Sequence, residues 1–172
     1  MSEAPKPADA ANDAANEPAS DAKPNEWFAR DGEREPGLRF SCTSCGACCS
    51  GPEGFVMVSD EETKRLANRM GVSIDKFVAV FTRPERGGRS LVELKTEHGH
   101  DCVFLDRERV PGRAICRVYE DRPQQCRTWP FWKQNLRRAR DWESSAQRCP
   151  GMNEGPLIPP ERVRVIRDAS PL

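Results

Sequence analysis

The sequence predicts a small α+β domain of irregular architecture, with short strands, one hairpin and a few short helices. Its length of 172 residues suits a single domain. Short apolar runs typical of strands alternate with segments whose apolar spacing is typical of helices. Hydrophobic residues make up only 37% of the chain and charged residues 31%, so the apolar core is modest. A domain of this kind is expected to gain stability from cross-links or bound metal.

Composition divides the chain into three parts. Residues 1–25 form a tail rich in alanine, proline and acidic residues, which has no large apolar side chain after Met1 and is expected to be disordered. Residues 26–155 contain all eight cysteines and form the predicted domain. Residues 156–172 form a C-terminal extension, within which the alternation at 163–165 predicts a late strand.

Two helices are predicted after a short strand at 55–58. Ser59 and Glu62 have the spacing of a capping box, in which each side chain bonds the backbone N–H of the other residue. A helix therefore begins near residue 60 and ends before Gly71, which suits a helix C-terminus. Ser73 caps a second helix, and the residues that follow it place one apolar face along 74–81.

The later elements are shorter. Residues 91–94 predict a strand, and residues 102–105 and 114–116 predict the two arms of a hairpin that turns at Pro111-Gly112. The sequence Asp121-Arg122-Pro123 is typical of a helix start, and this helix would carry Cys126.

The cysteine spacing carries the strongest chemical signal. Cys42, Cys45 and Cys48 are each separated by two intervening residues, a spacing that can direct their sulfurs to one side of a turn. Gly46 supplies the backbone freedom that such a turn needs. The sequence has no apolar run long enough to span a membrane, and its first residues do not resemble a secretory signal. A cytoplasmic location is therefore expected, where disulfides are rare and the thiols stay free. A redox pair or a disulfide framework explains eight cysteines less well than metal ligation does. The predicted ligands are Cys42, Cys45, Cys48, Cys49, Cys102, Cys116, Cys126 and Cys149.

Charge supports the same interpretation. The formal net charge is zero, yet residues 107–148 contain eleven Arg or Lys against five Asp or Glu. Four thiolates around zinc or an iron–sulfur core leave net negative charge, which Arg117, Arg122, Arg127 and Arg148 near the cysteines would offset.

The cysteine spacing leaves the number and type of centres open. Because adjacent side chains tend to diverge, we expect Cys48 and Cys49 either to face different centres or to include one spare thiol. The spacing of Cys42, Cys45 and Cys48 matches the first three ligands of a bacterial ferredoxin run, which slightly favours an iron–sulfur cluster over zinc. His98 and His100 offer a mixed site, although a polar loop explains them more simply.

The wider pattern resembles the YkgJ-like cysteine-cluster proteins, the CxxCxxCC family, over residues 38–155. The residues that carry the resemblance are Phe40-x-Cys42-x-x-Cys45-Gly46-x-Cys48-Cys49, Cys102-Val-Phe104-Leu105, Cys116-Arg-Val-Tyr119-Glu-Asp-Arg122-Pro123-x-x-Cys126-Arg127 and Cys149-Pro150-Gly151. The resemblance implies a domain that chelates zinc or iron. Flagellin lysine N-methylase has a similar cluster, which implies iron–sulfur-dependent methyl transfer as an alternative activity.

A nucleic-acid-binding module is the other alternative. Basic residues interleave with aromatic ones between Arg127 and Trp142, which could combine phosphate contacts with base stacking. We expect instead that these aromatic residues close the core around the cluster. No Ser/His/Asp arrangement is evident, so no catalytic residue is assigned, and the metal ion is the expected partner.

Overall fold

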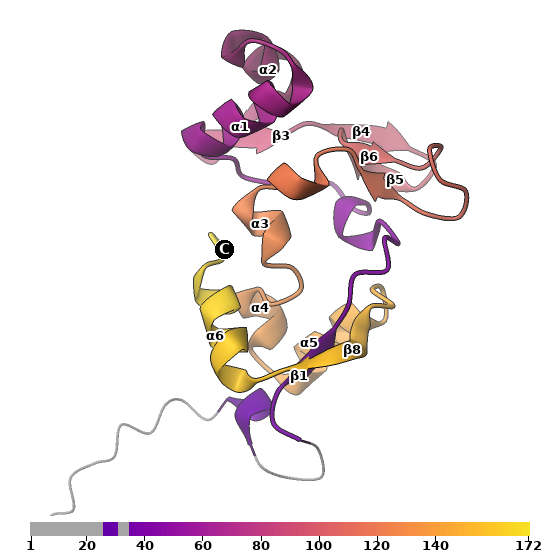
Figure 1. The fold of residues 1–172 in the computed structure, drawn as a ribbon, viewed down its shortest axis with the longest axis vertical. Coiled ribbons are helices and arrows are strands. Elements are labelled where there is room, and N and C mark those ends of the chain that lie inside the picture. Colours follow the sequence, from indigo (N-terminus) through magenta and orange to yellow (C-terminus); the bar gives the residue numbers. More distant parts are fainter. Residues whose placement is uncertain (1–25, 31–34) are drawn as a thin grey trace, which may run out of the picture.

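The computed structural model describes residues 26–30 and 35–172. The chain forms an α+β fold with two apolar clusters, one at each end of the molecule as drawn in Figure 1. It starts in the lower half, crosses to the upper half after residue 40, and returns through helix α3 (Gln124–Arg127). The first crossing, residues 41–50, carries Cys42, Cys45, Cys48 and Cys49, and the return through α3 carries Cys126. Cys102 and Cys116 end strands of the upper half, and Cys149 lies in the lower apolar cluster.

The lower half is built on an antiparallel pair of strands that joins distant parts of the chain. Strand β1 (Leu38–Phe40) pairs with β8 (Met152–Ile158), with a register shift before Phe40. Helices α4 (Lys133–Leu136), α5 (Ala139–Ala146) and α6 (Pro160–Asp168) accompany this pair. The short 3-10 helix η1 (Trp27–Ala29) adds Phe28 to the apolar cluster. The buried residues of this cluster are Phe28, Leu38, Phe131, Leu136, Trp142, Cys149, Met152 and Val163.

The upper half contains two helices and three hairpins. Helix α1 (Asp60–Met70) begins with the predicted capping box and ends at Gly71, and α2 (Ile74–Phe81) begins with the Ser73 cap. The hairpins pair β2 (Thr82–Glu85) with β3 (Gly88–Leu91), β4 (Glu93–Thr96) with β5 (Gly99–Cys102), and β6 (Leu105–Asp106) with β7 (Ile115–Cys116). The buried residues here are Val58, Leu66, Ala67, Phe77, Leu91, Phe104 and Val118.

The predicted α+β class is confirmed, and so are both early helices. The hairpin of the second half forms between β6 and β7, while Cys102 pairs with Glu93 in the preceding hairpin. A 3-10 turn, η3 (Tyr119–Asp121), precedes α3, whose N-cap is Pro123.

Two strand predictions were wrong. Residues 55–58 make only an isolated bridge between Met57 and Ser90. Residues 163–165 lie in α6, because Pro160 begins a helix there and the buried Val163 packs into the lower cluster from one helix face.

The three-part division of the chain stays a prediction. The expected tail at 1–25 lies outside the described residues. The expected boundary at 155 falls within β8, which pairs with β1. Among the helices in the described part of the chain, none has the length and apolar character needed to cross a membrane.

Candidate metal centre

The Cys42–Cys49 segment is a tight turn held against the β6–β7 hairpin. Gly46 has a φ of 78°, in the left-handed region, and precedes the 3-10 turn η2 (Ala47–Cys49). A Cβ at Gly46 would lie 2.6 Å from the Cβ of Ala114, so glycine is needed for close approach as well as for backbone conformation. The Ala114 N–H donates to the Ser44 carbonyl at 2.9 Å. These contacts bring the first cysteines next to the strand that ends in Cys116.

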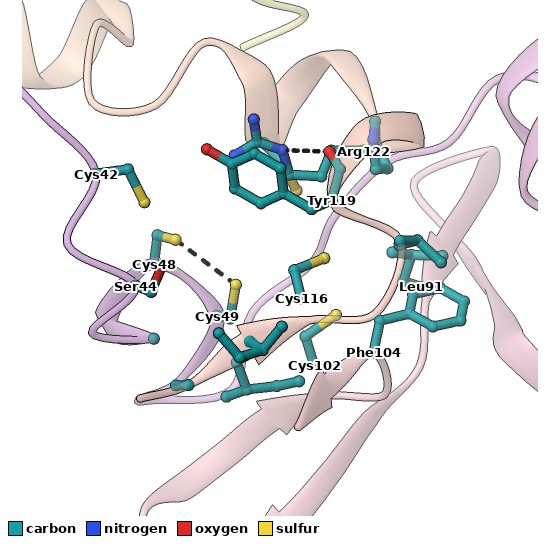
Figure 2. Close-up of a pocket in the computed structure, with 17 residues that line it drawn as sticks. Cys42, Ser44, Cys48, Cys49, Leu91, Cys102, Phe104, Cys116, Tyr119 and Arg122 are labelled. Carbon is teal, nitrogen blue, oxygen red and sulfur yellow. Dashed lines mark hydrogen bonds between the residues drawn. The ribbon is translucent and has the colours of Figure 1, made fainter. Parts of the chain in front are cut away.

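Six of the eight cysteines line one pocket of about 220 Å³. They come from the first crossing, from the ends of β5 and β7, and from α3, so residues more than eighty positions apart in sequence meet there. Figure 2 shows the first-crossing thiols on one side and those of the two hairpins on another. The six are Cys42, Cys48, Cys49, Cys102, Cys116 and Cys126.

The rest of the pocket is largely apolar. Leu91, Phe104 and Val118 contribute buried side chains from the upper cluster. Arg122 is the one charged residue of this lining, and its guanidinium lies 3.5 Å from the centroid of the Tyr119 ring (Figure 2). A hydrogen bond from Arg122 Nε to the Tyr119 carbonyl, 2.8 Å long, fixes the guanidinium there. The site therefore combines sulfur donors with one fixed positive charge.

Cys48 and Cys49 point toward each other. Their Sγ atoms lie 3.6 Å apart, within thiol hydrogen-bonding distance (Figure 2). The expected divergence of these adjacent side chains is therefore wrong. The 3-10 turn, bonded from Cys49 N–H to the Gly46 carbonyl at 2.8 Å, brings the two side chains to the same side.

The electrostatics of the thiols follow from this crowding. A hydrogen bond from the Cys49 thiol lowers the pKa of Cys48 to about 7, and the positive charge of Arg122 acts in the same direction. The same contact, together with burial, raises the pKa of Cys49, so the pair shares one proton. Burial raises the pKa of Cys102 to about 12 and also raises that of Cys126. Neighbouring thiolates add to both shifts, so a cation in the pocket would relieve their mutual repulsion.

Cys45 and Cys149 lie outside the pocket lining. Cys149 is only 5% exposed and packs in the lower cluster. Burial raises its pKa, the proximity of the Trp129 indole lowers it, and the charges of Cys45 and Cys48 raise it. Cys48 therefore lies within electrostatic range both of the pocket thiols and of Cys149.

The close approach of two backbones holds the Cys149 region beside the first crossing. The Ser41 N–H donates to the Gly151 carbonyl at 2.9 Å. A Cβ at Gly151 would lie 2.0 Å from the Ser41 carbonyl oxygen, so no larger residue fits without moving the backbone. Cys42 and Cys149 thus leave the β1–β8 pair at the same end.

All eight cysteines are free thiols in the structure. Within the described ranges 26–30 and 35–172, no three His, Cys, Asp or Glu side chains already have the arrangement needed to hold a metal ion. His98 lies in the turn between β4 and β5 and His100 lies in β5, and neither lines the cysteine pocket. The thiols are thus gathered around a common space without converging on one point.

Several residues that support this arrangement were not predicted. Asp101, adjacent to Cys102, is 7% exposed and accepts bonds from Ser50 and from Arg107, whose Nε lies 3.1 Å away. Burial alone would raise the pKa of Asp101, but these two partners outweigh it and hold the pKa below its ordinary value. The network ties the end of the first cysteine segment to β5. Its members are up to 57 positions apart, so no local spacing reveals it.

Glu62 is a second residue that stabilises the site. The sequence predicted its capping role in α1 but not its contact with α3. Its Oε1 accepts a 2.6 Å hydrogen bond from the backbone N–H of Gln124, the first residue of α3. The start of α1 is thereby joined to the helix that carries Cys126.

The cations near the cysteines divide into two kinds. Arg117, Arg127 and Arg148 donate to backbone carbonyls of the loops beside the cysteines. Arg122 lines the pocket. Burial raises the pKa of Cys116 overall, and the positive charge of Arg122 opposes this shift and also lowers the pKa of Cys48.

Comparison with known proteins agrees with the donor chemistry. No solved structure matches this chain. The family model CxxCxxCC, "Putative zinc- or iron-chelating domain", matches residues 41–150, which is well over half of the 172-residue chain. The match begins one residue before Cys42 and ends one residue after Cys149, so it spans all eight cysteines. The chain therefore belongs to the CxxCxxCC family of zinc- or iron-chelating domains.

Proposed function

We propose that this protein is a metal-binding module of the cytoplasm whose cysteine cluster holds zinc or an iron–sulfur centre. The observation that carries the proposal is the gathering of six thiols, from both crossings and two hairpins, around one pocket. Thiolates are soft ligands, and they are the donors that zinc and iron–sulfur clusters prefer. The family match supports zinc or iron as the bound metal.

The residues present suit such a centre. Burial and mutual repulsion raise the pKa values of the inner thiols, which is unfavourable for a set of thiolates alone and favourable once a cation sits among them. Arg122 supplies one fixed positive charge toward a thiolate-rich complex with net negative charge. A metal ion bound by cysteines from both crossings would cross-link these two segments of the chain.

Binding would also complete the fold. The pocket of about 220 Å³ is larger than one ion needs, and the thiols do not yet converge. We infer that the side chains turn inward and the pocket contracts around a single ion, or that it closes on a cluster. In either case the binding free energy appears as stability of the folded state.

Cys45 and Cys149 complete the proposed ligand set. Cys149 is within electrostatic range of both Cys45 and Cys48. With eight thiols in two adjacent groups, the arrangement suits either one centre with spare thiols or two centres that meet at Cys48.

The test is anaerobic purification followed by metal, acid-labile sulfide and visible-absorption analysis. We expect stoichiometric zinc in a colourless protein or iron with sulfide in a brown one. Cys126→Ser is expected to lower the metal content. Thr128→Ser is the matched control, because Thr128 is 2% exposed just after the same helix and serine keeps its hydroxyl bonds. Wild-type protein without metal, or equal metal content in both variants, would contradict the proposal.

Nucleic-acid binding and catalysis have less support than metal binding. Phe131 is 2% exposed and Trp142 is 0% exposed, so these two rings pack in the lower cluster instead of offering stacking surfaces. The pocket lining consists of thiols, apolar or small residues, Tyr119 and Arg122, without a histidine or carboxylate to act as a general base.

A further inference from the structure

The distance between the sulfurs of the adjacent residues Cys48 and Cys49 can be compared with the distance expected between two ligands of one metal ion. Their Sγ atoms lie 3.6 Å apart. Two sulfurs bound to one tetrahedral zinc, each at about 2.3 Å, lie about 3.8 Å apart. The pair therefore already has nearly the separation that two ligands of a single ion require.

We propose that Cys48 and Cys49 bind the same metal ion as a chelating pair. The inference rests on the proposed metal-binding function and specifies how the metal is held. Both residues line the pocket, where the sulfurs of the hairpin cysteines supply further donors. The hydrogen bond from Cys49 N–H to the Gly46 carbonyl fixes the backbone of η2, so binding of both sulfurs orders the side chains but not the turn itself.

A chelating pair restricts the type of centre. Zinc takes up to four thiolates on one ion, and each iron of a [2Fe–2S] cluster takes two from the protein. Each iron of a [4Fe–4S] cluster takes only one protein thiolate, and thiolates on different irons lie well apart. The contact between these two sulfurs therefore favours a mononuclear site or a [2Fe–2S] cluster and argues against [4Fe–4S].

The surroundings of the pair agree with a centre that is only partly enclosed. Cys48 is exposed and Cys49 is half-buried. Both residues, together with Cys102, also line a neighbouring pocket of about 410 Å³ on the side of Trp129 and Trp132. Cys102 lines both cavities together with the pair, so it is the hairpin cysteine that we expect to join Cys48 and Cys49 as a further ligand.

The first test needs no variant. Wild-type protein, purified or reconstituted without oxygen, is analysed for zinc, iron and acid-labile sulfide. We expect zinc or iron without sulfide, or two irons with two sulfides per centre. Four irons with four sulfides would overturn the chelating pair while leaving the proposed metal-binding function intact. Protein that takes up no metal at all would overturn both.

The second test counts thiolates with Co²⁺ as the probe. Sulfur-to-cobalt charge-transfer absorption grows with the number of thiolates on the ion, so losing one ligand of four is expected to remove about a quarter of it. We expect this decrease in both Cys48→Ser and Cys49→Ser when less than one Co²⁺ per protein is added, so that a single site is filled. The matched control is Ala47→Ser, which adds a hydroxyl to the same turn and keeps both thiols. An unchanged spectrum in either cysteine variant would contradict shared chelation, and circular dichroism verifies that each variant is folded.

Discussion

Replacing Glu62 by alanine is expected to loosen the joint between α1 and the cysteine-bearing helix α3. The carboxylate is 9% exposed and accepts two backbone hydrogen bonds. One comes from Ser59 N–H at 2.8 Å within the capping box, and the other from Gln124 N–H at 2.6 Å. Its loss leaves two donors near the protein interior without their acceptor.

The magnitude follows from these two bonds. A hydrogen bond to a charged group contributes about 1.5–3 kcal/mol, and water that enters the vacated space recovers part of the loss. We therefore expect the free energy of unfolding to fall by about 2–4 kcal/mol for Glu62→Ala. This exceeds the about 0.5–2 kcal/mol typical of losing a helix cap, because the bond to Gln124 is lost as well. Because α3 carries Cys126, metal affinity should fall as well.

Urea unfolding of the metal-free protein, followed by circular dichroism, measures this effect. With a slope of about 2 kcal/mol per molar urea, in the middle of the typical range, the midpoint should move down by roughly 1–2 M. Glu61→Ala is the matched control, because Glu61 is its exposed neighbour on the same helix and forms a surface ion pair with Lys64. Equal midpoints for Glu62→Ala and the wild type, or an equal shift in both variants, would refute the reasoning.

Three further substitutions test other parts of the account. An alanine in the left-handed conformation costs about 1–2 kcal/mol, and Gly46→Ala should lower the free energy of unfolding by more than this because its Cβ would also clash with that of Ala114. An unchanged thermal midpoint would contradict this prediction. Burial raises the pKa of Glu26, but Arg164 and Arg167 of α6 lower it overall. The ionised Glu26 therefore stabilises the fold above the ordinary carboxyl pKa of about 4.3, and this stabilisation is lost as the pH falls through the lower pKa of the folded state. Glu26→Gln should therefore flatten the acid side of the stability–pH curve, and curves that stay parallel would disprove it. Phe104→Ala removes a fully buried ring of the pocket wall and should cost about 3–5 kcal/mol in urea unfolding; a loss near zero would show that the wall is not packed.

The sequence predicted those elements whose determinants are local. Ser59 and Glu62 lie three positions apart in one turn, and Gly71 follows directly where the helix must end, so the bounds of α1 could be read from spacing. The late strand failed for the opposite reason. The alternation around Val163 suits a strand, yet Pro160 and the packing of Val163 in the lower cluster select a helix, and packing is not visible in the sequence.

The same distinction applies to the candidate site. The cysteines could be singled out by spacing, but their division into six around the pocket and two beside it depends on how the crossings pack. The contact between Cys48 and Cys49 arises from the 3-10 turn after Gly46, whose side-chain directions no spacing rule gives. The support of Asp101 by Ser50 and Arg107 joins distant segments and could be found only in three dimensions.

Convergence of the thiols on bound metal can be measured residue by residue. Metal-loaded and chelator-treated protein are labelled with light and heavy iodoacetamide, and mass spectrometry gives the labelling rate of each cysteine. We expect the six pocket cysteines to be protected together when metal is bound and to become reactive together after chelation. Equal labelling rates for those six cysteines with and without metal would contradict a thiolate-bound centre in this pocket.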